Sequence, residues 1–106
     1  MRKLREAEMT PGKIQGARGV VDVYDVIQGE LTAGVRIVKA DSDVPTRPHI
    51  HSEKQVIYVI SGSGKITNGK ETFNLGPGDF ILLESKEEHY VTTKNEDLKI
   101  FEIKYP

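Results

Sequence analysis

Short runs of alternating apolar and polar residues follow one another along most of the chain, separated by residues that favour turns. Val, Ile, Tyr, Phe and Thr dominate these runs, which is typical of half-buried β-strands. We expect nine strands, at residues 20–27, 33–40, 47–51, 55–61, 65–67, 71–74, 79–84, 89–93 and 98–105. Between two of them, Asn68-Gly69 favours a two-residue type I′ hairpin. Helical signal is limited to residues 3–9, before Thr10-Pro11-Gly12.

The last run shows one apolar and one charged face. Phe101, Ile103 and Tyr105 alternate with Glu102 and Lys104. Because successive side chains of a strand point to opposite faces, the first three are expected to be buried and the two charged residues to face water.

Residues 55–60 are apolar on both faces. Ile57 and Val59 share one face, and the other carries three more apolar residues, Val56, Tyr58 and Ile60. Such a strand needs cover on both sides. A second sheet with an overhanging loop would supply it, and so would a subunit interface.

The length of 106 residues fits one domain spanning 1–106, in which 1–16 form an N-terminal arm. Many short strands in one domain indicate an all-β sandwich or small barrel. The 15 basic and 16 acidic residues give a net charge of −1, which argues against binding to nucleic acid or a membrane surface. No apolar run is long enough for a membrane span, and none follows the basic start Met1–Glu6 as a signal peptide would require. We therefore expect a cytoplasmic protein.

The chain contains no cysteine and only three histidines, His49, His51 and His89. Disulfides, thiolate nucleophiles, zinc fingers and iron–sulfur clusters are therefore excluded. A transition metal would have to be held by these imidazoles and by oxygen donors. His49 and His51 are two residues apart in a predicted strand, so both imidazoles are expected on one face, where they can converge on one ion.

The spacing around these histidines resembles the cupin superfamily, whose members are jelly-roll β-barrels or sandwiches with a metal in the barrel mouth. Residues 47–62 reproduce the first cupin motif, in which two histidines one residue apart precede a further ligand position, here Gln55, and a glycine, here Gly62. Residues 78–93 align with the second motif and place His89 at its metal-ligand position. The resemblance covers residues 33–105 and implies one divalent ion held by His49, His51, Gln55 and His89.

The sequence departs from the cupin pattern at several of these positions. Gln55 stands where the common ligand set has glutamate, and Glu84, Lys86 and Thr93 replace the proline, glycine and asparagine of the second motif. An amide oxygen is a neutral donor, so the ion would keep its full positive charge, which favours Lewis acidity and anionic ligands. Some cupins use three histidines with glutamine, including a zinc-containing polyketide cyclase. Zinc, nickel, manganese and iron all remain open, and so does a metal-free pocket in which the histidines serve only as polar groups.

Other residues are candidates for the pocket. Glu53 could turn inward as a general base, or point to solvent at the rim. Arg47 has the parity to reach the pocket and hold a carboxylate, although a surface position suits it as well. The apolar lining is expected to include Ile37, Phe80, Phe101 and Ile103.

Two functions remain open. In the first, a metal-binding cupin performs chemistry on a small oxygen-rich molecule, as a dioxygenase or as an isomerase, cyclase or lyase. In the second, the protein binds a small molecule without catalysis. The resemblance and the doubly apolar strand also favour a homodimer.

Overall fold

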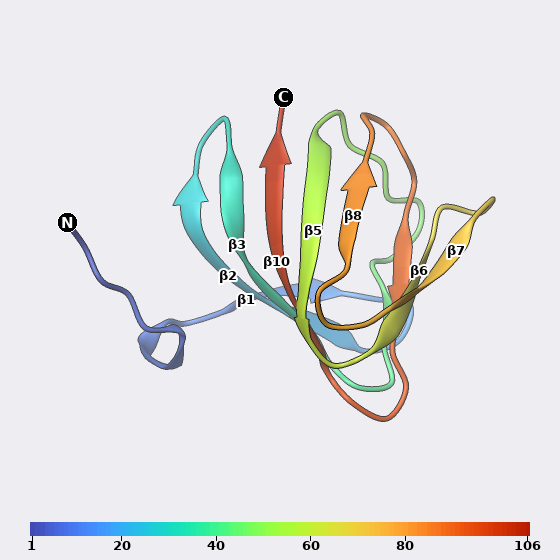
Figure 1. Cartoon of the computed structure of the whole chain (residues 1–106), viewed down its shortest axis with the longest axis horizontal. Helices are drawn as coiled ribbons and strands as arrows, with labels where there is room; N and C mark the ends of the chain where they lie inside the picture. The colour runs from blue at the N-terminus through green and yellow to red at the C-terminus, as the bar shows by residue number, and fades with distance from the viewer.

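Two antiparallel β-sheets pack face to face in the computed structural model, which describes residues 1–106 (Figure 1). The six-stranded sheet has the order β1 (Gly12–Gln15), β2 (Val20–Gln28), β3 (Thr32–Val38), β10 (Leu98–Tyr105), β5 (Lys54–Ser61), β8 (Phe80–Leu83). The four-stranded sheet has the order β4 (Asp43–Val44), β9 (Tyr90–Thr92), β6 (Gly64–Thr67), β7 (Thr72–Leu75). The only helical element is a 3-10 turn at Glu6–Glu8, and nothing helical is long and apolar enough to cross a bilayer. The expected all-β jelly-roll sandwich is confirmed.

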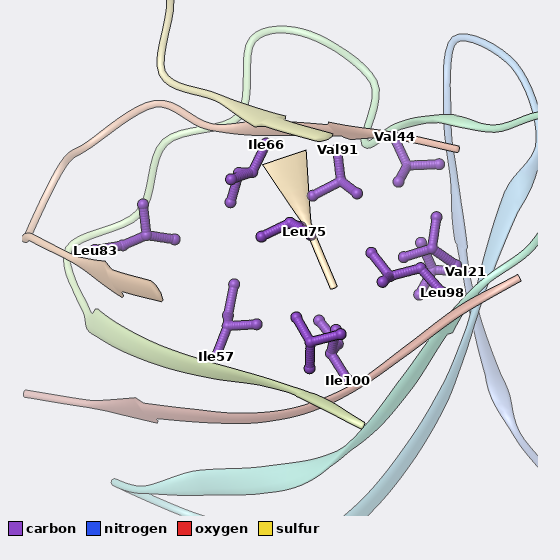
Figure 2. Packing of buried hydrophobic residues seen from close by; sticks show 11 residues of the cluster. Val21, Val44, Ile57, Ile66, Leu75, Leu83, Val91, Leu98 and Ile100 are labelled. Carbon is purple, nitrogen blue, oxygen red and sulfur yellow. The ribbon is translucent and has the colours of Figure 1, made fainter. Parts of the chain in front are cut away.

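The core lies between the two sheets and draws on every strand from β2 to β10 (Figure 2). Its eleven buried side chains are Val21, Val38, Val44, Ile57, Val59, Ile66, Leu75, Leu83, Val91, Leu98 and Ile100. Val59 and Leu98 have no exposed surface. Most of the strands are half-buried, so alternate residues supply this core and the others face outward.

The inward face of β10 is the opposite of the one expected from its sequence. Leu98, Ile100 and Glu102 are buried, whereas Phe101 and Ile103 lie on the outer face and are only half-buried. The prediction was wrong because it took a charged residue as a mark of solvent. Glu102 is accommodated inside the sandwich by hydrogen-bonded partners, which are described below.

Residues 47–51, expected to form a strand, lie in the loop between β4 and β5. Pro45 and Pro48 have no N–H to donate to a sheet ladder, which disfavours a paired strand here. The loop crosses from the four-stranded to the six-stranded sheet. Only the N–H of Thr46 and the carbonyl of His51 make backbone hydrogen bonds within 45–51, to Gln15 and Lys86 respectively.

Two other local predictions need correction. β1 was not expected, because Ile14 is the only residue in it that is even partly buried. The turn at Asn68-Gly69 is a four-residue loop rather than a type I′ hairpin, since Thr67 pairs with Thr72 and only Gly69 has a positive φ. The Asn68 side-chain oxygen accepts hydrogen bonds from the N–H groups of Lys70 and Glu71, and these contacts stabilise the longer loop.

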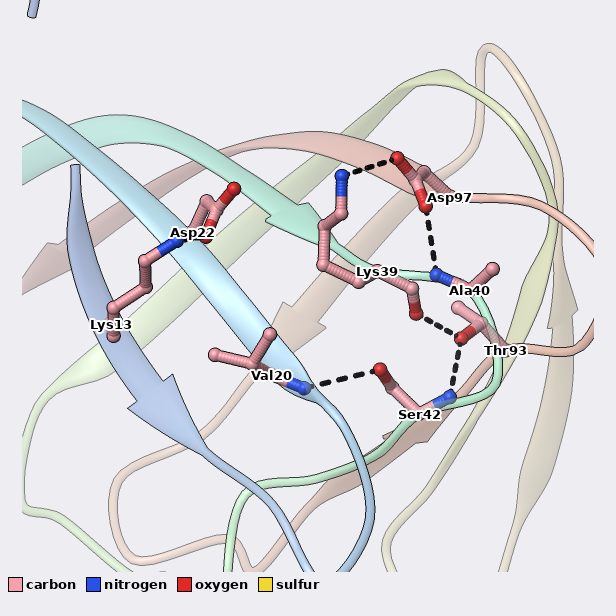
Figure 3. Close-up of polar contacts among 8 residues, drawn as sticks. All are labelled: Lys13, Val20, Asp22, Lys39, Ala40, Ser42, Thr93 and Asp97. Carbon is pink, nitrogen blue, oxygen red and sulfur yellow. Dashed lines mark hydrogen bonds and ion pairs between the residues drawn. The ribbon is translucent and has the colours of Figure 1, made fainter.

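A polar network ties together the end of the sandwich where β3 ends and β10 begins (Figure 3). The Thr93 hydroxyl donates to the carbonyl of Lys39 at 2.6 Å and accepts from the N–H of Ser42 at 3.0 Å. Asp97 accepts from the Lys39 ammonium at 2.9 Å and from the N–H of Ala40 at 2.8 Å. Thr93, which replaces the asparagine of the second motif, is therefore buried with both of its hydroxyl roles satisfied.

The outer face of the six-stranded sheet carries two rows of apolar residues, which we call the outer rows. They follow directly from the cross-strand register: one row is Tyr24, Val35, Phe101, Tyr58 and Phe80, and the other is Ile27, Ala33, Ile103, Val56 and Leu82. No loop covers the β5–β8 part of this face, because Tyr58 is 38%, Phe80 67% and Leu82 71% exposed. The second sheet covers the inner face of β5, as expected. The overhanging loop expected over its outer face is absent, and that face is open.

Candidate metal centre

The three histidines, expected to converge, come together at one end of the sandwich. His49 and His51 are supplied by the β4–β5 loop, and His89 directly precedes β9. Their ring centroids are 5.2, 5.2 and 5.5 Å apart, and the ring planes cross at 76–81°. One nitrogen of each ring lies within 4.8 Å of one nitrogen of each other ring. Three imidazole edges thus surround one point, an arrangement that suits a metal ion.

The surroundings keep at least two of these imidazoles neutral. Burial lowers the pKa of His89, and burial together with the charges of His89 and His51 lowers the pKa of His49 to about 4. His89 Nδ1 lies 3.0 Å from the carbonyl oxygen of Glu87, so Nδ1 carries the proton and donates it. The lone pair of His89 Nε2 is then free, as metal ligation requires.

His51 and Glu53 form a pair at the rim. Both ring nitrogens of His51 are buried and make no hydrogen bond, and Nδ1 lies 3.7 Å from a carboxylate oxygen of Glu53. Hydrogen bonding to its own backbone N–H is the main effect that lowers the pKa of the Glu53 carboxyl, which favours the ionised form. This position suits a carboxylate that orients His51 from behind, as carboxylates commonly do for metal-bound histidines. A role for Glu53 as a general base stays a prediction.

Gln55 adds an oxygen donor beside two of these histidines. Its side chain is 1% exposed and lines the cavity together with His49 and His89. Its Nε2 donates to a carboxylate oxygen of Glu102 at 2.6 Å, whereas its Oε1 is buried with no partner. Buried acceptors without a partner are rare, because each one costs the free energy of its lost hydration. A divalent cation would satisfy Gln55 Oε1 and the one His51 ring nitrogen that carries a lone pair, so these residues fit the implied metal.

The cavity between the sheets has a volume of about 80 Å³ and a mixed lining. Its apolar wall includes Ile57, Val91 and Ile100, and its polar groups are His49, Gln55, His89, Arg36, Glu102 and Lys104. A cavity of roughly 150 Å³ accommodates benzene. Only a few ligand atoms would therefore fit inside, and a longer molecule would extend through the mouth.

None of the five side chains expected to line the pocket lines this cavity. Ile37, Phe80, Phe101 and Ile103 have the opposite strand parity and lie on the outer face. Arg47 stays on the loop, where it pairs with Asp43 at 2.7 Å and covers the ring of Tyr90, with 3.8 Å between the guanidinium carbon and the ring centre.

Sequence reasoning missed three charged residues of the cavity, Arg36, Glu102 and Lys104. The available signal was parity, since Arg36 shares the strand face of the core residue Val38, and Glu102 and Lys104 share that of Leu98 and Ile100. A charged residue on the same strand face as core residues indicates a buried polar site when an opposite charge can reach it.

Comparison with known proteins now decides the family. A family model described as a cupin domain matches residues 34–104, about two thirds of the sequence. The chain belongs to the cupin family. No curated protein matches this cupin, whereas many solved structures do.

Three of those structures illustrate the likeness. A predicted oxalate decarboxylase from Thermotoga maritima has a TM-score of 0.84 at 20% identity, over 98% of this cupin and 98% of that chain. The plu4264 protein from Photorhabdus luminescens has a TM-score of 0.77 at 23% identity, over 100% and 87%. The polyketide cyclase RemF from Streptomyces resistomycificus has a TM-score of 0.77 at 17% identity, over 98% and 78%. At these identities the likeness shows the shared fold, and activity has to be argued from the site.

Proposed function

We propose that this cupin binds one divalent metal ion through His49, His51, His89 and Gln55 and uses it for chemistry on a small oxygen-rich molecule. The observation that carries the proposal is the set of buried polar atoms without partners, the two His51 ring nitrogens and Gln55 Oε1, beside two further imidazoles. Without a cation, these buried atoms would destabilise the folded protein, because each has lost its hydration without gaining a partner. Zinc, nickel, manganese and iron are all compatible with three imidazoles and one oxygen donor.

The charges of the cavity favour an anionic ligand. Four neutral donors leave the charge of a bound ion uncompensated, and a bound ion of this kind acts as a Lewis acid that polarises a ligand oxygen. Lys104, directly opposite Gln55 in the sheet register, makes no ion pair or hydrogen bond through its ammonium group. Lys104 can therefore attract a carboxylate or enolate oxygen to the mouth, and the apolar wall excludes water from the rest of the ligand.

Among the reaction classes, isomerisation, cyclisation or lyase chemistry suits this donor set better than dioxygen cleavage. A neutral set stabilises anionic forms of a substrate, and it is poorly suited to stabilising high-valent iron. The named relatives include a predicted oxalate decarboxylase and a polyketide cyclase, and a further similar structure is the DMSP lyase DddQ from Ruegeria pomeroyi.

Binding without catalysis is the second candidate, and one observation favours it. Both oxygens of Glu102, the only carboxylate in the cavity lining, already interact with Gln55 and Arg36. No free carboxylate base therefore faces a ligand inside the cavity.

Metal content is the first test. The protein is expressed with zinc, nickel, manganese and iron supplied, purified, analysed by mass spectrometry for bound metal, and then screened against small hydroxy and keto acids. We expect a metal content near one ion per chain and turnover of at least one acid only with the ion present. Ligand-induced NMR shifts without turnover would favour the binding function. A content below ~0.1 ion per chain under all four conditions would overturn the metal-dependent proposal.

We also propose that the outer rows form a homodimer interface. Tyr58 and Phe80 lie in one row with 4.7 Å between ring centres, and the row continues through Phe101 and Val35 across four strands. A continuous apolar sheet face of this kind is unusual on a monomer, and the same patch on two copies forms an isologous contact.

Light scattering coupled to gel filtration tests the dimer. Wild-type protein is expected at twice the chain mass of 11.8 kDa, and the double variant Phe80→Lys with Leu82→Lys at the chain mass itself. Leu31→Lys is the matched control, because Leu31 is an exposed apolar residue outside the outer rows. A monomeric wild type, or a control that dissociates as much as the double variant, would contradict this interface.

A further inference from the structure

Behind Gln55 lies a chain of buried polar contacts that the proposed metal chemistry does not use. Gln55 donates to one oxygen of Glu102 at 2.6 Å, and the other Glu102 oxygen lies 3.3 Å from Arg36 Nε. Arg36 Nη1 donates to Asp25 at 2.6 Å, on the far side of the chain of contacts. Arg36 is 5% and Glu102 8% exposed, so water contributes little to either.

The hydrogen-bonding roles in this row of contacts determine the orientation of the Gln55 amide. Glu102 is ion-paired with Arg36, so its carboxylate accepts hydrogen bonds and has none to donate. Gln55 must therefore present its NH₂ group to Glu102. Its carbonyl oxygen occupies the other arm of the amide, where it is buried and makes no hydrogen bond. Reversing the amide would place two acceptors 2.6 Å apart in a buried site, which is strongly unfavourable.

We infer that Glu102 is a positioning residue, which holds the Gln55 carbonyl oxygen toward the three histidines so that a neutral amide serves as the fourth donor. Arg36 holds the other oxygen of Glu102 in place, at 3.3 Å from its Nε. The negative charge that a glutamate ligand would bring directly is thus present on Glu102, which lies behind Gln55. This inference rests on the proposed metal function, and it deepens the role of Gln55 there.

The variant Glu102→Gln tests the inference directly. The new amide has a single carbonyl oxygen, and the cationic Arg36 competes for it most strongly, which leaves the NH₂ group of the new amide facing Gln55. The Gln55 amide then has to turn over and present its own NH₂ group to the histidines. We expect affinity for Co²⁺, measured by competition with a chelator, to fall by about 10–100-fold, as is typical when a residue that orients a ligand is lost. Visible absorption of the cobalt complex reports whether the donor set has changed.

A readout without metal keeps the two questions separate. In the metal-free protein the side-chain ¹⁵N–¹H₂ resonances of Gln55 report its hydrogen bond to the Glu102 carboxylate. We expect these resonances to shift in Glu102→Gln. Unchanged resonances would overturn the positioning role whether or not the protein binds metal. A wild type that fails to bind Co²⁺ and yet shows the predicted resonance change would overturn the metal function and support the positioning role.

Two further variants control for loss of charge and loss of fold. Asp25→Asn removes a charge from the far end of this row of polar contacts but leaves Glu102 paired with Gln55. We therefore expect Co²⁺ affinity within about threefold of wild type. The exchange Gln55→Glu with Glu102→Gln reverses the hydrogen bond, conserves the total charge and supplies a carboxylate ligand. We expect it to restore affinity to at least the wild-type value. If Asp25→Asn weakens binding as much as Glu102→Gln, or if the exchange fails to restore binding in a folded protein, Glu102 does not act through the Gln55 amide.

Discussion

Replacing Arg36 by methionine should lower the free energy of unfolding by about 3–5 kcal/mol, because it leaves the carboxylates of Asp25 and Glu102 without their cation in a buried site. The side chains of Asp25 and Glu102 are only 14% and 10% exposed, so hydration cannot replace the lost contacts. Single domains are commonly stable by about 5–15 kcal/mol, so the loss is a large share of the total. Denaturant unfolding of the metal-free protein measures it, and the melting temperature should fall on the order of 20 °C.

Lys39→Met provides the matched comparison. Lys39 pairs with Asp97 at 2.9 Å, but both side chains are more than 40% exposed. Exposed ion pairs typically contribute about 0–1 kcal/mol, so this variant should unfold nearly as wild type does. If the two variants lose similar free energy, the buried ion pairs of Arg36 do not stabilise the fold in the way their burial indicates.

His89→Ala should reduce Co²⁺ or Zn²⁺ affinity by more than about 100-fold, beyond the effect expected from losing a residue that only orients a ligand. His89 is the one histidine supplied from outside the β4–β5 loop, and it is 5% exposed with its Nδ1 proton donated to the Glu87 carbonyl. Without it, the proposed ion would lose one of its three imidazole donors. Chelator competition at pH 7.5, with circular dichroism to confirm folding, measures the effect.

Tyr90→Phe is the control for this substitution. It changes the residue next to His89 by removing a hydroxyl that donates to Glu88, and it retains the ring that Arg47 covers. We expect its metal affinity to stay within about threefold of wild type. A folded His89→Ala protein that binds metal as tightly as Tyr90→Phe would show that His89 is not a ligand.

The position of the histidines was the easiest part of the site to predict. The resemblance to the spacing of the two cupin motifs implied that His49, His51 and His89 converge, and they do so although residues 47–51 form a loop and not a strand. The spacing depends on the chain length between donors and on the shape of the sandwich, and neither requires a paired strand. Pro48 is compatible with the start of an edge strand, so the sequence alone did not exclude a strand at residues 47–51.

The inner wall of the cavity could not be predicted in the same way. Arg36 and Glu102 are 66 positions apart in sequence, and they meet only because β3 lies beside β10 in the sheet. Alternation places both residues on the face of core residues, but an isolated charge is rarely buried, so each one taken alone is expected at the surface. Arg36 and Glu102 can be buried only as an ion pair, and an ion pair between two strands cannot be predicted until the strand order is known.

The sparse backbone bonding of the β4–β5 loop would couple the proposed ion binding to the order of the loop. Two of the four proposed donors sit on a segment with only two backbone hydrogen bonds, so part of the free energy of ion binding is offset by the entropy lost in ordering it. Arg47 already limits that entropy by joining the loop to Asp43 and Tyr90. The affinity of the centre can therefore be adjusted by residues that never touch the ion, through the order they impose on the loop.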